Sequence, residues 1–298
     1  MTNKDTFSSY HPGVNFLYFA LVLAFTMFAA DPVILVLSLL CALRYAGYLK
    51  GGKAVRFSLV CMLPLALMAA VVNPAFNHRG ATVLAYLPSG SPLTLESILY
   101  GLSAAVMLAA VILWFSCYTE VMTSDKFVYL FGRVIPALSL VLSMTLRFVP
   151  RFKAQFRAVA DAQRCAGRDV SEGSVRQRLR RGITILSILV TWAMENAIET
   201  ADSMRARGYG LPGRTAFSIY RFEERDRALL LWLGACGGYL ICGWAAGALD
   251  WRWYPTVEGA PVTPFTVSVP LVFLALCLTP VFLDRREDAV WKRLRSEI

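Results

Sequence analysis

The sequence predicts an all-α polytopic membrane protein with about six transmembrane helices and a cytoplasmic coupling domain of long amphipathic helices. Three observations support this fold class. Of the 298 residues, 57% are hydrophobic and 17% are charged, whereas soluble proteins average about 25% charged residues. The apolar residues gather in separate runs close to the roughly 20 residues that cross a bilayer. Lys and Arg are concentrated in a few segments between those runs.

Six apolar runs meet or approach the length of a span. The predicted spans are Val14–Ala30, Pro32–Leu49, Phe57–Val72, Ser97–Thr119, Ala228–Leu249 and Val267–Leu283. The first is expected to be a retained span and not a signal peptide, because more apolar sequence follows it directly. The second is the weakest, because it requires Arg44 to place its guanidinium at the interface.

The distribution of basic residues predicts the topology. Of the 30 Lys and Arg residues, 18 lie between Glu120 and Arg227, whereas Asn73–Leu95 and Asp250–Thr266 carry one each. This is the positive-inside pattern, and it places both termini and the 120–227 segment in the cytoplasm. The net charge of +10 is thereby attributed to topology, with the lipid bilayer and not nucleic acid as the partner.

The insert divides the chain into a four-span membrane domain at 1–119, a cytoplasmic coupling domain at 120–227, and a two-span membrane domain with a basic tail at 228–298. Within the insert, Pro136 and Pro150 interrupt the apolar stretch Val134–Val149. We expect this stretch to form a helix along the interface. A seventh span is the alternative.

Two long helices are predicted in the rest of the insert. One begins near Phe152 and the other runs from about Ser174 to Arg207, with Gly208 placed to end it. Each helix carries alanine at every fourth position, and such small residues let two backbones approach closely. We hypothesise that the helices cross along these stripes; alternatively, the alanines are simply good helix formers. The stripes are Ala154, Ala158 and Ala162 on the first helix, and Ala193, Ala197 and Ala201 on the second.

The residues that carry enzyme chemistry are missing from the pattern. The chain has no Gly-x-x-x-x-Gly-Lys phosphate loop. It has two histidines, far apart, and seven cysteines without a Cys-x-x-Cys pair, so neither a metal site nor a catalytic residue is predicted. The main alternative function is a self-contained secondary transporter or channel with a regulatory cytoplasmic domain. An intramembrane hydrolase or lipid-modifying enzyme is a second alternative, although it would require clustered polar residues inside spans.

The end of the second long helix admits two interpretations. Arg207 could satisfy the free carbonyls and the negative end of the helix dipole. It could instead form a docking tip, in which Ala206 permits close approach, Arg207 offers a guanidinium to carboxylates, and Gly208 turns the chain away. The residue pattern alone leaves both interpretations open.

Two motifs and the order of elements resemble one known family. Arg205-Ala206-Arg207-Gly208-Tyr209-Gly210 is followed by Arg214-Thr215, which resembles the second Ala-Arg-Gly motif of the transmembrane T component of energy-coupling factor (ECF) transporters. This family includes the cobalt and biotin transporter T subunits. Thr145-Leu146-Arg147-Phe148-Val149-Pro150 is similar to the Leu-Arg-Phe-x-Pro segment of the family's coupling domain, whose motif residues are Arg147, Phe148 and Pro150. The order of four spans, a helical insert and further spans also agrees.

The resemblance implies a scaffold in the plasma membrane of a prokaryote. Its partners would be two ABC ATPase subunits, which hydrolyse ATP, and a membrane-embedded substrate-binding S component for a vitamin, metal ion or other micronutrient. The chain itself would bind no cofactor. Each Arg motif would dock into one ATPase.

The first motif departs from the family pattern. Its place in the chain reads Arg164-Cys165-Ala166-Gly167-Arg168. The position expected to hold arginine is occupied by Ala166, and either Arg164 or Arg168 could make the contact.

Overall fold

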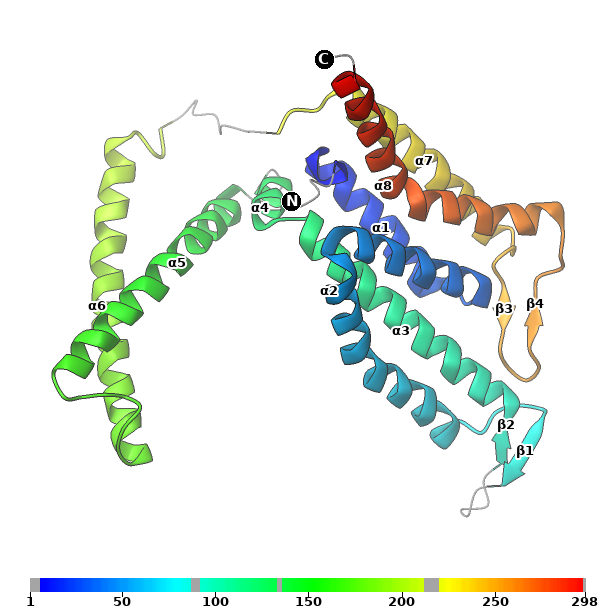
Figure 1. Cartoon of the computed structure of the whole chain (residues 1–298), viewed down its shortest axis with the longest axis horizontal. Coiled ribbons are helices and arrows are strands. Elements are labelled where there is room, and N and C mark those ends of the chain that lie inside the picture. Colours follow the sequence, from blue (N-terminus) through cyan, green and yellow to red (C-terminus); the bar gives the residue numbers. More distant parts are fainter. Residues whose placement is uncertain (1–5, 87–91, 133–135, 212–219, 297–298) are drawn as a thin grey trace. The chain divides into compact units, whose positions relative to one another are not determined.

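The computed structural model describes residues 6–86, 92–132, 136–211 and 220–296. It is mostly helical, as predicted (Figure 1). In chain order, the elements are η1 (Phe7–Ser9), α1 (Pro12–Phe28), α2 (Pro32–Phe76), β1 (Val83–Tyr86), β2 (Pro92–Thr94), α3 (Leu95–Val121), α4 (Ser124–Gly132), α5 (Pro136–Cys165), α6 (Val175–Ala206), α7 (Glu224–Ala245), β3 (Trp251–Arg252), β4 (Glu258–Gly259) and α8 (Pro264–Ser296).

The chain packs as two units. The membrane unit comprises Met1–Thr123 and Tyr220–Ile298, and the insert unit comprises Ser124–Ile219. These units report packing within the chain. The assignment of functional domains to 1–119, 120–227 and 228–298 stays a prediction.

Among the described residues, four helical segments are long and apolar enough to cross a membrane. They are Pro32–Gly52, Leu95–Val121, Glu224–Ala245 and Pro264–Ser296. Four predicted spans therefore coincide with such helices, including the one from Pro32 that sequence suggested to be the weakest. The apolar helices Pro12–Phe28 and Met62–Phe76 are shorter, so the count of six stays a prediction.

The second and third predicted spans are the two arms of α2. Gly51 separates them with φ of 76° and ψ of 162°, which are not helical angles. Glycine adopts this left-handed region without the steric cost that a Cβ atom brings. The bend therefore falls where the sequence supplies glycine and where Lys50 reaches α3, donating to Ser116 Oγ at 2.8 Å.

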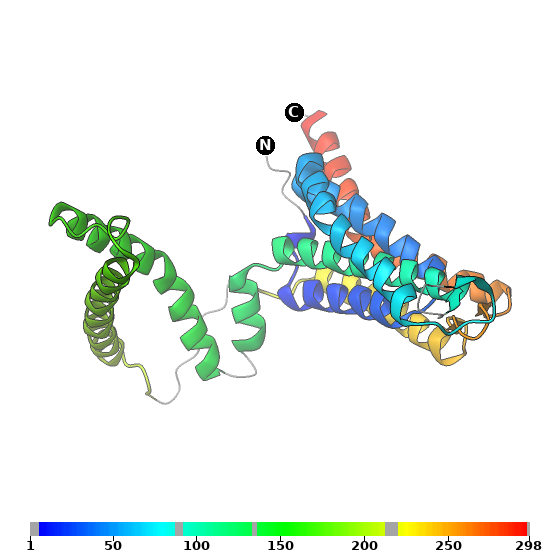
Figure 2. The same cartoon turned by 90° about the horizontal axis from the view of Figure 1, so that it is seen from below.

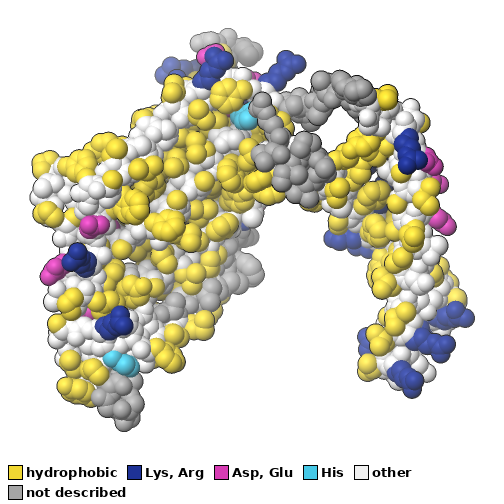
Figure 3. Space-filling model, turned by 180° about the vertical axis from the view of Figure 1, so that it is seen from behind, with side chains coloured by type: hydrophobic (Ala, Val, Ile, Leu, Met, Phe, Trp, Pro, Cys, Tyr) yellow, Lys and Arg dark blue, Asp and Glu magenta, His cyan; other side chains and the backbone are white. Residues whose placement is uncertain are grey.

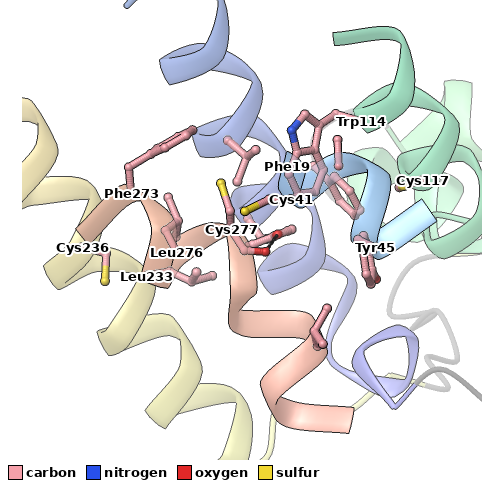
Figure 4. Close-up of a cluster of buried hydrophobic side chains, with 14 of the residues drawn as sticks. Phe19, Cys41, Tyr45, Trp114, Cys117, Leu233, Cys236, Phe273, Leu276 and Cys277 are labelled. Carbon is pink, nitrogen blue, oxygen red and sulfur yellow. Dashed lines mark hydrogen bonds between the residues drawn. The ribbon is translucent and has the colours of Figure 1, made fainter. Parts of the chain in front are cut away.

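The hydrophobic core of the membrane unit joins α1, α2, α3, α7 and α8 and includes a cluster of aromatic side chains (Figure 4). Trp114 is fully buried and its indole N–H donates to Ser38 Oγ at 3.0 Å. The hydroxyl of Tyr18 donates to the carbonyl of Cys277 at 3.1 Å. Figure 4 places the sulfur atoms of Cys41 and Cys277 close together in this core. The indole N–H of Trp114 and the hydroxyl of Tyr18 are thus both hydrogen-bonded, as burial in an apolar interior requires.

Two short antiparallel hairpins, β1–β2 and β3–β4, lie in the two connections that carry one basic residue each. Glu96 is 3% exposed next to the first hairpin. Its carboxylate accepts from the backbone N–H of Thr82 at 3.1 Å and from the Thr82 hydroxyl at 2.8 Å. Asn77 donates to the Tyr254 hydroxyl at 3.0 Å, which ties the loop after α2 to the loop after β3.

The expected interruption at Pro150 is wrong, because α5 continues from Pro136 to Cys165 with Pro150 inside it. Proline removes one backbone hydrogen bond, but the turns on both sides can keep theirs, so a kinked helix can continue. The alternative of a seventh span over 134–149 is not among the four span candidates in the described part of the chain.

Candidate functional site

The candidate site is built on α5 and α6, which contact each other within the insert unit (Figures 1 and 2). α6 begins with a capping box: the Ser174 hydroxyl accepts from the N–H of Gln177 at 3.4 Å, and the Gln177 side chain accepts from the N–H of Ser174 at 3.2 Å. These bonds satisfy two donors at the start of the helix. The sequence predicted a helix from about Ser174, and the Ser-x-x-Gln pattern explains why the helix begins there.

An aromatic pair links the two helices. The ring centroids of Phe152 on α5 and Trp192 on α6 lie 5.4 Å apart in an edge-to-face arrangement. On α6, Ile185 and Leu189 are buried. The Phe152–Trp192 pair is therefore a direct contact between α5 and α6, and the sequence analysis did not predict that these two residues meet.

The alanine stripes are mostly exposed. Ala193 is partly buried, while the other five alanines of the stripes are exposed: Ala154, Ala158, Ala162, Ala197 and Ala201. Their exposure leaves these surfaces open, and their proposed role in helix crossing stays a prediction.

α6 ends in a Schellman cap around Gly208, the sequence-predicted terminator. The N–H of Tyr209 donates to the carbonyl of Met204 at 3.0 Å, and the N–H of Gly208 donates to the carbonyl of Arg205 at 2.9 Å. Gly208 has φ of 75°, the left-handed conformation that this cap requires. The carbonyls of Met204 and Arg205 are thus already satisfied by the backbone. Arg207 is exposed, and its guanidinium is not needed for those two carbonyls.

α5 ends in a cap with the same hydrogen-bond pattern. The N–H of Arg168 donates to the carbonyl of Gln163 at 2.9 Å, and the N–H of Gly167 donates to the carbonyl of Arg164 at 3.0 Å. Gly167 has φ of 73°. The two helix ends can therefore be compared residue by residue by aligning Gly167 with Gly208.

The comparison places Arg164 at the position of Arg205, Ala166 at the position of Arg207, and Arg168 at the position of Tyr209. We call the end of α5 around Gly167 the first tip and the end of α6 around Gly208 the second tip. The first tip has the glycine cap and one of the two arginines of the second tip. It lacks the arginine directly before the glycine and has Arg168 directly after the glycine.

The loop after Gly167 is braced by side chains. Arg164 pairs with Asp169 at 3.2 Å. Arg181 donates to the carbonyls of Asp169 and Glu172, the latter at 2.8 Å, and Arg178 donates to the carbonyl of Val170 at 3.0 Å. Two arginines at the basic start of α6 therefore fold the loop back onto that helix.

Asp169 is the acidic centre of this brace. Its carboxylate accepts from the N–H of Ser171 at 2.9 Å. Hydrogen bonds from Ser171 hold the pKa of Asp169 below its usual value, and Arg164 and Arg181 lower that pKa further. Asp169 is therefore ionised at neutral pH and keeps Arg164 beside the loop. Sequence reasoning missed this residue, because its partners are identified only once the path of the loop is known.

The remaining motif residues lie on α5 before the aromatic pair or outside the described chain. Arg147 and Pro150 are exposed, and Phe148 is half-buried with its ring 6.5 Å from that of Phe152. Arg214 and Thr215 lie outside the described residues.

The chemistry of these tips is that of charge recognition. Exposed guanidinium groups next to a tight turn can bind carboxylates with paired N–H donors. Figure 3 shows Lys and Arg side chains gathered at the lower end of the insert unit, where α5 ends and α6 begins. Within the described residues, no cluster of three His, Cys, Asp or Glu side chains could hold a metal ion.

Comparisons with known proteins agree on one family. Residues 7–217 match the family model CbiQ, described as cobalt transport protein. Several relatives, three of which are described here, carry the name energy-coupling factor transporter transmembrane protein EcfT. The protein from Exiguobacterium sibiricum is 37% identical over 105 residues and the one from Lacticaseibacillus paracasei is 36% identical over 110 residues; these alignments cover 35% and 37% of this chain and 40% of each relative. The protein from Bacillus selenitireducens is 29% identical over 221 residues, which are 70% of this chain and 81% of the relative.

Proposed function

The chain belongs to the CbiQ family of cobalt transport proteins, and we propose that it is the energy-coupling scaffold of an ABC-type ECF importer. In this assembly it is the non-catalytic transmembrane component. Two ATPase subunits hydrolyse ATP, and a separate S component in the membrane binds the micronutrient. Cobalt is a candidate substrate through the family description, but the S component would select it.

The observation that carries this proposal is the pair of glycine-capped, arginine-bearing tips on α5 and α6, which contact each other. The first tip is tied by Arg181 to the beginning of α6, and the second is the end of α6 itself. The helical rise from Arg181 to Arg207 is about 39 Å at about 1.5 Å per residue. Two tips held this far apart by one stiff helix suit docking to two separate subunits.

We assign the ATPase contact at the second tip to Arg207 and at the first tip to Arg168. Arg207 is exposed beside the turn at Gly208. At the first tip, Arg164 is engaged with Asp169, whereas Arg168 is exposed directly after Gly167. The proposed role of Arg164 is to position the loop that presents Arg168.

Closure of the ATPases on ATP would move the two tips, and the packed helices would transmit this motion towards the S component. The charge distribution supports an orientation with both termini and the insert unit in the cytoplasm. In that orientation both tips are accessible to soluble ATPase subunits.

Affinity purification of the full chain from native membranes tests the proposal. We expect two ATPase subunits and a small membrane protein to co-purify, and the reconstituted assembly to import its substrate only with ATP. Recovery of the chain without an ATPase, together with transport by the chain alone in proteoliposomes, would contradict the scaffold function and support a self-contained transporter.

A further inference from the structure

A groove of about 570 Å³ lies on the membrane unit between α7 and α8. Its walls are apolar along most of their length. On α7 they include Leu229 and Trp232, and on α8 they include Leu278 and Phe282. Phe282 is 68% exposed and Trp232 is 47% exposed, so the groove opens to the surroundings of two helices that are long enough to span the bilayer.

One end of the groove is basic. The lining includes Arg225 on α7 and Arg286 on α8. Arg225 precedes Leu229 by four residues and Arg286 follows Phe282 by four, so each arginine lies one turn from an apolar wall residue on the same helix face. The two helices run in opposite directions, yet both place their arginine at the same end of the groove.

The nearby acidic residues are engaged in other contacts or lie at the rim. Asp226 accepts from the N–H groups of His11 at 3.0 Å and Glu223 at 2.9 Å. Glu223 pairs with Nε of Arg225 at 2.9 Å, and Arg225 also lies over the ring of Tyr10 at 5.2 Å. Glu287, next to Arg286 in the sequence, acts electrostatically on Tyr10. A guanidinium has five N–H donors, so the pair with Glu223 leaves donors on Arg225 for a phosphate. Among the described residues Arg286 forms no salt bridge.

We propose that this groove is a binding site for one anionic phospholipid, with an acyl chain between α7 and α8 and the headgroup phosphate between Arg225 and Arg286. The position fits this ligand, because α8 changes there from apolar sequence to the charged segment after Leu283, as a helix does when it leaves the hydrocarbon for the headgroup region. Basic pockets between transmembrane helices on the cytoplasmic side bind anionic headgroups. A zwitterionic choline lipid would bring a cation close to both guanidinium groups and is expected to bind more weakly.

The bound lipid would tie the inner ends of α7 and α8 together where the chain re-enters the membrane unit from the insert. This binding is a property of the membrane unit and does not depend on ATPase docking. The inference therefore stands apart from the proposed transport function.

Native mass spectrometry of the full-length chain in detergent tests the site with phosphatidylglycerol and phosphatidylcholine as probes. We expect phosphatidylglycerol to bind about tenfold more tightly than phosphatidylcholine. The double variant Arg225→Gln/Arg286→Gln should lose this preference, whereas Arg295→Gln, which removes a charge from the same helix outside the groove, should keep it. Excess inorganic phosphate should not displace the lipid, because the acyl chain supplies much of the binding.

A volume variant tests the apolar part independently of charge. Leu278→Trp should fill the groove and weaken phosphatidylglycerol binding several-fold, whereas Leu271→Trp, on the exposed surface of α8 outside the groove, should not. Size-exclusion profiles like that of the wild type establish that each variant is folded. Equal binding of the two lipids, an unaffected double variant, or displacement by inorganic phosphate would overturn the proposal. Photo-crosslinking from position 278 in native membranes to a protein instead of a lipid would also overturn it.

Discussion

Arg164 and Arg205 occupy equivalent positions in two helix caps with the same hydrogen-bond pattern, and in each case the carbonyl of the arginine accepts from the N–H of a left-handed glycine. Arg207 has Ala166 as its counterpart at the end of α5. The two tips therefore share their backbone geometry and differ in the side chains that they present.

The second tip is expected to depend on Arg207. Arg207→Glu should weaken association of the chain with its ATPase, because the variant replaces charge attraction by repulsion. We expect the affinity to fall at least about tenfold, which corresponds to a loss of about 1.4 kcal/mol in binding free energy. Quantitative co-purification measures this association, and membrane insertion should be unchanged. Arg157→Glu, on the exposed surface of α5, makes the same charge change away from both caps and serves as the control. Normal transport by Arg207→Glu would exclude the docking role.

At the first tip, the contact with the ATPase by Arg168 and the positioning of the loop by Arg164 should be separable by mutation. Arg168→Ala is expected to weaken association with the ATPase by itself. Arg164→Ala should have a smaller effect that follows loosening of the loop, since an exposed salt bridge contributes little to stability. Hydrogen–deuterium exchange of residues 167–174 distinguishes the two variants, because Arg164→Ala should increase exchange there and Arg168→Ala should not. A larger loss of association in Arg164→Ala with unchanged exchange would assign the contact to Arg164.

The cap glycines should respond differently from a glycine inside the same helix. Gly208→Ala places a Cβ at φ of 75° and 3.1 Å from Leu211. The left-handed conformation alone costs about 1–2 kcal/mol for a residue with a side chain. We expect amide exchange in residues 205–211 of the full chain to rise several-fold. Gly182→Ala meets no atom within 4 Å and should stabilise α6 by about 1 kcal/mol. Equal effects of the two substitutions would show that the turn at Gly208 does not define the tip.

Acidification should release the loop at the first tip. The pKa of Asp169 is lower in the folded chain than in the unfolded chain, where it is about 3.9. The ionised carboxylate therefore contributes its full stabilisation when the pH is above the unfolded pKa. This stabilisation is lost as the pH falls through the lower, folded pKa. Exchange of residues 167–174, corrected for the intrinsic pH dependence, should therefore increase at acidic pH. Asp169→Asn removes the titrating group and should lack this increase. A similar increase in both proteins would place the titration elsewhere.

Sequence was sufficient for the features that local chemistry or the bilayer determines. The predicted helix from about Ser174 to Arg207 agrees with α6, because Ser174 and Gly208 are strong start and stop residues. Four span positions follow from apolar length, which the bilayer imposes. The prediction at Pro150 was wrong, because a rule for helix interruption was applied where a kinked helix can continue. The two hairpins were not predicted, since strands of two to four residues are too short for a period of two to be recognised.

The parts of the site that sequence did not reveal depend on the path of the chain. The bonds from Arg181 to carbonyls 9 and 12 residues earlier require the loop to fold back, which no local spacing encodes. The Phe152–Trp192 pair joins residues 40 positions apart, and the alanine pattern drew attention to a different face of the same helices.

The last prediction compares the aromatic contact with the alanine stripes. Double-mutant cycles with Phe152→Ala and Trp192→Ala in the full chain should give a coupling energy of about 0.5–1.5 kcal/mol, as measured for aromatic pairs, because the two rings are in direct edge-to-face contact. Ala158→Leu and Ala197→Leu enlarge exposed positions, so each should leave the thermal stability of the isolated chain within about 0.5 kcal/mol. If the stripes pack in the assembled transporter, these leucines should nevertheless impair assembly or transport. Unchanged assembly and transport in the Ala158→Leu/Ala197→Leu variant would reject the role of the stripes, and the aromatic pair would then be the main contact that keeps α5 and α6 together.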